Sequence, residues 1–238
     1  MKKPAAPMSQ PKAFALLSVL FLCLCCTTLH AAEYGQYDPK RLLTPKEPAG
    51  TGATLDLVYL DSIMADLRQH AGTYPPSFDS PADMQRAQHD AGYLIGLFKA
   101  MFSSGGAPPP HMLLRMALLG SAAHNLDARG GADFAQTYFQ KLLQADPDHA
   151  AGNYHYGIFL ASTGRAKDAL RYLLKAKAKG MTPALYGLGM SYLQLGDTAK
   201  ALENLLAYQQ AEPKDSTVAM LIEAIRSGKI ETQRTNAQ

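Results

Sequence analysis

The sequence predicts an all-α chain that forms a helix-turn-helix repeat solenoid, with about three repeats between an N-terminal helical cap and a C-terminal capping helix. Three similar stretches support this prediction, at residues 119–131, 153–165 and 185–197, and they follow one another at offsets of 34 and 32 residues. Their apolar residues recur at spacings of three and four, as on one face of a helix. No stretch shows the strict alternation of a half-buried strand.

The segments that follow these stretches also agree with one another. Residues 131–147, 165–180 and 197–213 bring Ala135, Ala169 and Ala201 into register, five residues after Gly130, Gly164 and Gly196. These glycines fall where an apolar run stops, and a helix commonly ends there in a left-handed residue. Each repeat is therefore expected to contain two helices joined by a short turn.

This pattern resembles the tetratricopeptide repeat, which has small residues near positions 8 and 20, a large apolar residue at 24 and a proline near 32. The first unit has Ala123, Ala135, Phe139 and Pro147 at these positions, and the third has Gly189, Ala201, Leu205 and Pro213. The middle unit has Gly157, Ala169 and Leu173 but Met181 in place of the proline, and it is also similar to the Sel1-like repeat. The resemblance covers residues 116–215 and implies stacked helix pairs with a concave groove.

The small residues are expected to act as packing devices. An interior glycine costs a helix roughly 0.5 to 1 kcal/mol relative to alanine, so it needs a compensating role. We expect Gly157 to lie against Ala169 and Gly189 against Ala201, with Ala123 and Ala135 as the equivalent pair in the first repeat. Contact with a ligand is the alternative role for the glycines.

Residues 1–32 have the order of a secretory signal peptide. Lys2, Lys3 and Lys12 precede an apolar run at 13–26, and small residues provide a cleavage site after Ala31 or Ala32. The run is too short to span a bilayer comfortably, so we expect cleavage and a periplasmic or secreted protein. A retained interfacial helix and a lipid-anchored cysteine are the alternatives.

Cleavage would change the charge and the cysteine content of the chain. The full sequence has 23 Lys and Arg against 20 Asp and Glu, and the loss of three lysines makes the mature chain neutral. A neutral chain lacks the concentrated basic face that nucleic-acid binding requires. All three cysteines would also leave, so we expect no disulfide and no cysteine metal site. One basic run is interpreted as a solvated face rather than an anion site: Lys167, Arg171, Lys175, Lys177 and Lys179.

The remaining chain is divided by composition and periodicity. We assign 33–53 to a flexible linker, 54–109 to an N-terminal helical region, 110–215 to the repeats, 216–228 to the C-terminal capping helix and 229–238 to a disordered tail. The linker assignment rests on three prolines and three glycines with few apolar residues. Within the helical region, Ser80 followed by Pro81 marks the start of a second helix.

The sequence carries no motif with a defined chemistry. It has no phosphate-binding glycine loop, nucleophile elbow, metalloprotease helix or calcium loop, so we expect no cofactor and no metal. His149 and His155 would point to different faces of a helix, which does not suit a shared metal ion. For an enzyme with an active site between the N-terminal helices and the repeats, the best candidates are Asp83, His89 and Asp90.

The resemblance implies which residues line the groove. By repeat position they are His124, Asp127, Tyr154, Ile158, Tyr186, Met190 and Leu193, together with Gly120 and Ala151. Chaperone-binding members of the family hold a terminal carboxylate with lysine and asparagine, and these positions have neither. An aromatic and apolar groove suits a peptide held by apolar anchors. Alternatively, Tyr154 and Tyr186 pack on neighbouring repeats, and His124 is an ordinary surface residue.

These expectations lead to three functional hypotheses from different classes. The first is a non-enzymatic interaction module or scaffold in a bacterial cell-envelope assembly, which binds a protein or peptide partner in its groove and associates peripherally with the envelope. The second is a structural subunit that self-associates through the ends of its solenoid, and the third is a periplasmic enzyme. The first two rest partly on analogy with the family, because a fold does not by itself specify a function.

Overall fold

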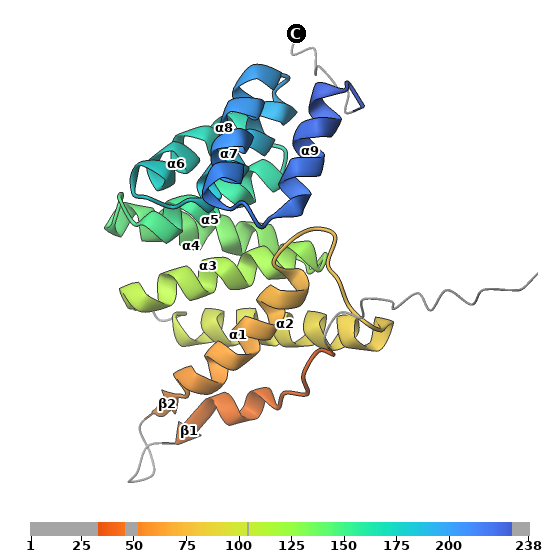
Figure 1. Ribbon diagram of the computed structural model, residues 1–238. Coiled ribbons are helices and arrows are strands. Elements are labelled where there is room, and N and C mark those ends of the chain that lie inside the picture. The colour runs from red at the N-terminus through yellow and green to blue at the C-terminus, as the bar shows by residue number, and fades with distance from the viewer. Residues whose placement is uncertain (1–32, 46–51, 104, 230–238) are drawn as a thin grey trace, which may run out of the picture. The chain divides into compact units, whose positions relative to one another are not determined.

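Consecutive helices pack against each other along most of the chain in the computed structural model (Figure 1). The structure describes residues 33–45, 52–103 and 105–229, which all lie in one compact unit. The predicted signal peptide at 1–32, and all but the first residue of the predicted tail at 229–238, lie outside the described residues. Within the described part of the chain there are nine α-helices and one two-stranded hairpin.

Six of these helices form the three predicted repeats, each as a pair. The pairs are α3 (Pro110–Asn125) with α4 (Gly131–Ala145), α5 (Ala150–Ser162) with α6 (Ala166–Ala178), and α7 (Pro183–Gln194) with α8 (Thr198–Ala211). The pairs stack because α4 also packs on α5, and α6 on α7. The helix α9 (Ser216–Arg226) packs on α8 at the end of the array. The all-α repeat fold is therefore confirmed.

The turn inside each repeat uses a left-handed glycine. Gly130, Gly164 and Gly196 have φ values of 80°, 79° and 77°. After Gly164, the backbone N–H of Arg165 donates to the Leu160 carbonyl oxygen at 2.8 Å, which satisfies one of the free carbonyls at the end of α5. The left-handed glycines that the sequence predicts at the helix ends are therefore present at these turns.

The small residues allow the two helices of each repeat to approach closely, and leucines that the sequence did not predict lie nearest to the glycines. A Cβ atom at Gly157 would lie 2.6 Å from Cγ of Leu173, and one at Gly189 would lie 2.6 Å from Cγ of Leu205. Gly189 is also close to the Ala201 carbonyl oxygen, at 3.3 Å from that Cβ position. Leucines of the second helix therefore fill the space over the glycines. The six predicted packing positions, Ala123, Ala135, Gly157, Ala169, Gly189 and Ala201, are all buried.

The closest approach in the first repeat occurs at Gly120, which was expected in the groove. A Cβ atom there would overlap the backbone nitrogen of Ala135 and lie 2.7 Å from its Cα. Backbone therefore meets backbone where α3 crosses α4. This glycine is a packing residue, and its assignment to the groove was wrong.

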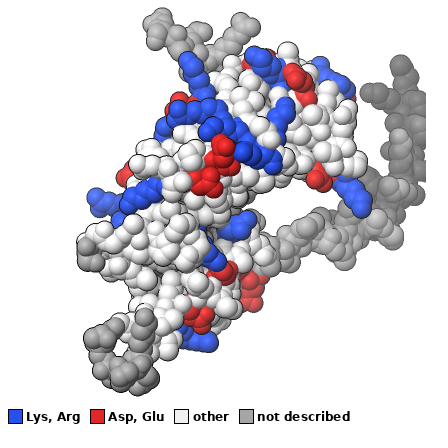
Figure 2. All heavy atoms as spheres, turned by 90° about the vertical axis from the view of Figure 1, so that its left-hand side faces the viewer, with Lys and Arg blue, Asp and Glu red and all other residues white. Residues whose placement is uncertain are grey.

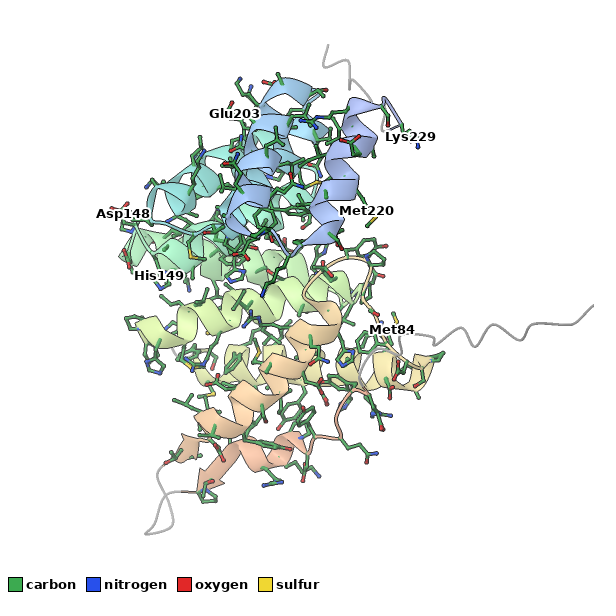
Figure 3. All side chains as sticks on the ribbon, in the orientation of Figure 1. Met84, Asp148, His149, Glu203, Met220 and Lys229 are labelled. Atoms are coloured by element: carbon green, nitrogen blue, oxygen red, sulfur yellow. The ribbon has the colours of Figure 1, made fainter. Side chains whose placement is uncertain are left out.

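Two further helices cover the N-terminal side of the array, and both pack on α3. Asp56 caps the N-terminus of the helix α1 (Leu57–Ala71), and its side chain accepts a hydrogen bond from Tyr59 N. As the sequence predicted, Ser80 caps the N-terminus of the helix α2 (Pro81–Met101), and its hydroxyl accepts a hydrogen bond from Asp83 N. Side chains fill the spaces between these helices and the repeats (Figure 3). No helix of the described chain is long and apolar enough to cross a membrane.

The described part of the segment predicted to be a flexible linker packs on the helical region instead. Tyr34 and Leu42 are fully buried, and Pro39–Leu42 forms the 3-10 helix η1. The strands β1 (Leu43–Pro45) and β2 (Ala53–Leu55) pair antiparallel, with Leu43 opposite Leu55. The linker prediction is corrected for these residues, because a few well-placed large side chains outweigh the proline and glycine content.

We predict that Gly120→Ala lowers the free energy of unfolding by about 1 to 3 kcal/mol, because the added methyl group forces the backbones of α3 and α4 apart. The matched control is Gly96→Ala on α2, where a Cβ atom meets nothing within 4 Å. That change should raise stability by about 0.4 to 1 kcal/mol, because alanine favours a helix over glycine. Urea unfolding measures both, and equal effects would contradict the close approach at Gly120.

Candidate functional site

The concave side of the array contains a hollow of about 530 Å³. Helices α3, α5 and α7 contribute residues to its lining, as does the C-terminal end of α1. Four predicted groove residues line it: Tyr154 and Ile158 from α5, and Tyr186 and Met190 from α7. Each pair is spaced by four residues, so both side chains lie on the same face of their helix. We call this hollow the groove.

The N-terminal region supplies a second wall that the repeat positions did not predict. Arg68 and Gln69 come from the last turn of α1, and Gly72, Thr73 and Tyr74 follow that helix. The Tyr74 side chain remains largely exposed, at 67%. No periodic pattern indicates such residues, because they reach the groove only through the packing of α1 on α3.

Asn125 of α3 also lines the groove, which corrects the expectation that it holds no asparagine. Its side chain is buried, and Nδ2 donates a hydrogen bond to the Ala71 carbonyl oxygen at 2.9 Å. The amide therefore joins the end of α3 to the end of α1. This bond fixes the N-terminal wall relative to the first repeat.

His155 is the titratable residue of the groove whose protonation is most altered by its surroundings. Its ring lies 4.8 Å from the Tyr154 ring, measured between centroids. Burial, with a smaller contribution from the positive charge of Arg68, lowers the pKa of His155 to about 4. Burial also raises the pKa of Tyr154. Both side chains are therefore neutral at neutral pH, and the groove floor is aromatic and uncharged there.

Besides Gly120 and Ala151, three predicted groove residues do not line the hollow. His124 packs edge-on against Phe159, at 5.9 Å between ring centroids. Asp127 is exposed in the turn after α3, with a φ of 56°. Leu193 is buried with Leu205 and Val218 between α7, α8 and α9. It shares a helix face with Met190, three residues earlier, but α8 and α9 cover it.

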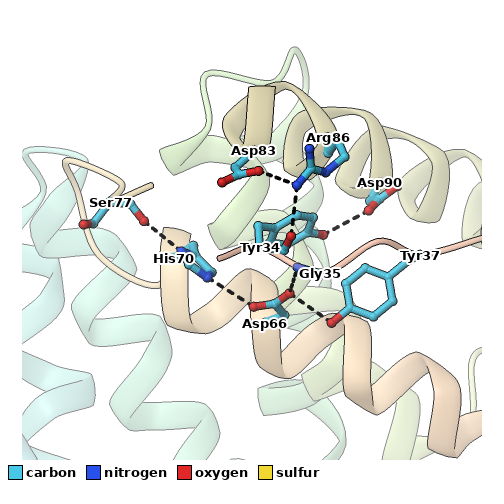
Figure 4. A network of polar contacts seen from close by, with 9 residues as sticks. All are labelled: Tyr34, Gly35, Tyr37, Asp66, His70, Ser77, Asp83, Arg86 and Asp90. Carbon is cyan, nitrogen blue, oxygen red and sulfur yellow. Dashed lines mark hydrogen bonds and ion pairs between the residues drawn. The ribbon is translucent and has the colours of Figure 1, made fainter. Parts of the chain in front are cut away.

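The candidate catalytic residues of α2 belong to a polar network around the N-terminal segment (Figure 4). The Tyr34 hydroxyl donates to Asp90 Oδ2 at 3.1 Å, and this pair is buried. Arg86 donates to the Tyr34 carbonyl oxygen at 3.1 Å and also pairs with Asp83. Burial raises the pKa of Tyr34 above its usual value, with Asp90 adding to the effect. Asp83 and Asp90 thus hold the N-terminal segment against α2.

A second carboxylate of the network secures the same segment from α1. Asp66 Oδ2 accepts hydrogen bonds from the Gly35 backbone at 2.7 Å and from the Tyr37 hydroxyl at 2.9 Å. Its Oδ1 lies 3.2 Å from Nε2 of His70, whose Nδ1 contacts the Ser77 carbonyl oxygen at 2.9 Å. These contacts leave the carboxylate engaged on both oxygens. Asp66 therefore holds the N-terminal segment against α1.

His89 lies beside this network without completing a catalytic arrangement. Its side chain is 73% exposed, and Nδ1 is 3.4 Å from Asp90 Oδ1. An open hollow of about 510 Å³ borders it, lined also by Gln36, Tyr37 and Arg86. Within the described residues there is no group of three or more His, Cys, Asp or Glu that could hold a metal ion.

The basic run of α6 makes local contacts. Lys179 pairs with Asp148 at 3.1 Å, and Lys177 Nζ donates to Asn204 at 3.3 Å. The guanidinium of Arg171 stacks 4.5 Å above the Tyr172 ring. Figure 2 shows lysine and arginine side chains with carboxylates among them on this side of the molecule. Figure 3 places Asp148 at the turn between α4 and α5. The mixture of signs fits a solvated face.

Comparison with known proteins adds little beyond the fold. No protein-family model matches the chain, and no curated protein matches it. Among solved structures, a thermophilic TPR protein from Thermus thermophilus is similar with a TM-score of 0.47 and 18% sequence identity. The match covers 71% of this chain and 91% of that one. The helix pairs described above show an all-α fold of stacked helix-turn-helix repeats.

We predict that protonation of His155 destabilises the fold in mildly acidic solution. A pKa lowered from 6.5 to about 4 means that the unfolded chain binds a proton at a higher pH than the folded chain. Stability from this group is complete above about pH 6.5 and is lost as the pH falls toward about 4. His155→Gln should therefore lose less stability than the wild type between these limits, as measured by urea unfolding. An NMR titration of the His155 ring with a midpoint near 6.5 would contradict this assignment.

Proposed function

We propose that the protein is a non-enzymatic interaction module that holds a partner peptide or protein in its concave groove, as a scaffold in a bacterial cell-envelope assembly. The observation that carries the proposal is the groove of about 530 Å³, where Tyr154, Ile158, Tyr186 and Met190 line one continuous hollow. All four are half-buried, so each presents part of its apolar surface to an occupant. Aromatic and methionine side chains are common anchors in protein interfaces.

A non-enzymatic role is supported by what the polar side chains do. Asp83 and Asp90, two of the three catalytic candidates of the sequence, are buried and bonded to Arg86 and Tyr34, respectively. Their contacts hold the N-terminal segment to α2 and leave no paired nucleophile and base. The groove has no acidic side chain among its described lining residues, so a general acid–base pair of carboxylates is not available there.

Export is supported by the sequence of the first 32 residues and is compatible with the fold. The first described residues are Glu33 and Tyr34, and Tyr34 is fully buried. Cleavage after Ala31 or Ala32 would therefore remove none of the described packing. The mature protein would begin next to the residue that anchors its N-terminal segment.

Self-association through the solenoid ends is the second candidate, favoured by one exposed residue. Met220 on α9 is 65% exposed and points away from the neighbouring helices (Figure 3). The opposite face of α9 is buried through Val218, Ile222 and Ile225. Two copies could therefore meet through the outer face of α9, although a single methionine offers a small apolar contact.

The groove is tested by Tyr154→Ala combined with Tyr186→Ala, in a crosslinking pull-down from intact envelope. We expect the double variant to keep its helical content and to bind its partner at least about ten-fold more weakly, because anchor side chains carry much of an interface energy. Tyr93→Ala is the matched control, because Tyr93 lies on α2 outside the groove and is 37% exposed. Recovery of the protein itself as the main product, unchanged in the double variant, would favour self-association.

Export is tested by the mass of the protein recovered from cells that express the full sequence. We expect a chain that begins at Ala32 or Glu33, because signal peptidase cleaves after small residues. A chain that retains residues 1–32 would show an uncleaved segment. A lipid-modified chain that begins at Cys23, Cys25 or Cys26 would show an anchored lipoprotein instead.

A further inference from the structure

The lining of the groove is asymmetric in charge. Among the described residues that line the groove, Arg68 in the last turn of α1 is the one lysine or arginine, and there is no aspartate or glutamate. The guanidinium group of Arg68 forms no hydrogen bond or ion pair with the part of the chain that the structure describes. An arginine is charged at every physiological pH and presents five N–H donors. The groove therefore contains one unneutralised positive charge.

The position of Arg68 directs this charge toward the groove floor. Its field acts on Tyr154 and on His155, where it opposes protonation of the imidazole ring. His155 is neutral at neutral pH, so it does not add a second positive charge. Arg68 itself is exposed at the rim, while Tyr154, Ile158 and Tyr186 are half-buried below it. A cation thus borders an aromatic and apolar surface.

We propose that the partner segment carries a side-chain carboxylate next to its apolar anchors and that Arg68 binds this carboxylate. The inference rests on the proposed function of the groove and specifies the chemistry of the occupant. An arginine can bind a carboxylate through two parallel hydrogen bonds, which fixes its direction as well as its position. The helical region before the repeats then has a role in recognition, because α1 supplies the charge that selects the partner.

An internal acidic side chain fits this site better than a free carboxyl terminus. Capture of a terminus requires several convergent donors, such as a cluster of backbone N–H groups. Asn125 lines the groove, but its side-chain Nδ2 already donates a hydrogen bond to the Ala71 carbonyl oxygen. A segment that lies across the apolar floor would place one of its side chains at the rim, where Arg68 is exposed. Nucleic acid is disfavoured because its binding requires several cations along one surface.

The proposal is tested by selecting peptides from a random library displayed on phage and joined to the coat protein through their C-terminal ends. No displayed peptide has a free terminal carboxylate, so any enrichment of acids reports side chains. We expect the wild type to enrich sequences with Asp or Glu beside apolar residues. Arg68→Glu should instead enrich Lys or Arg, because the charge at the rim is reversed.

The affinity of one selected peptide then measures the contribution of Arg68. Arg68→Gln should weaken binding about five-fold, the effect expected of a single partly exposed ion pair. The same peptide with Gln in place of its acid should bind the wild type and Arg68→Gln equally well. Arg129→Gln is the control, because Arg129 is also exposed but does not line the groove. Circular dichroism checks that each variant is folded.

The possible results separate this inference from the proposed function. Enrichment of neutral apolar peptides by both the wild type and Arg68→Glu would overturn the role of Arg68 and leave the peptide groove in place. Absence of any enrichment by the folded wild type, relative to phage on the empty support, would overturn both the groove function and this inference. A preference for acids that persists in Arg68→Glu would also overturn the assignment to Arg68.

Discussion

The close approach of the two helices within each repeat determines the rest of the architecture. At Gly120 the backbone of α3 meets the backbone of α4 at Ala135, and at Gly189 a leucine of α8 packs directly over α7. Interiors pack at the density of organic crystals, so small changes in one crossing propagate to neighbouring elements. The positions of α5 and α7 follow from these crossings, and so do the positions of Tyr154 and Tyr186 on the concave side.

The periodic part of the structure could be predicted from the sequence, and the part that depends on distant contacts could not. Tyr154, Ile158, Tyr186 and Met190 follow from their place in the repeat, because helical periodicity fixes which side chains share a face. Arg68 and Tyr74 reach the groove through the docking of α1 on α3, which leaves no local pattern. Leu193 fails for a related reason, because the addition of α9 converts an apparent surface position into an interior one.

The N-terminal segment shows a different limit of sequence analysis. Its glycines and prolines suggest a linker, yet Tyr34 is fully buried and its hydroxyl is bonded to Asp90 across 56 positions of sequence. Carboxylates removed from water are costly unless they accept hydrogen bonds, and here the half-buried Asp66 and the buried Asp90 accept them from hydroxyl and backbone donors. Asp90, a catalytic candidate of the sequence, therefore joins α2 to the chain that precedes it, and Asp66 does the same for α1.

The apolar side chains of the two ends of the array belong to separate packing clusters. One cluster extends from Tyr34 to Leu188, and the other joins Leu193, Leu205 and Ile222 around α8 and α9. During evolution, duplication or loss of a repeat near α9 would alter the length of the concave surface without disturbing the bond between Asn125 and Ala71. The architecture thus allows the length of the concave surface to vary independently of the charge at α1.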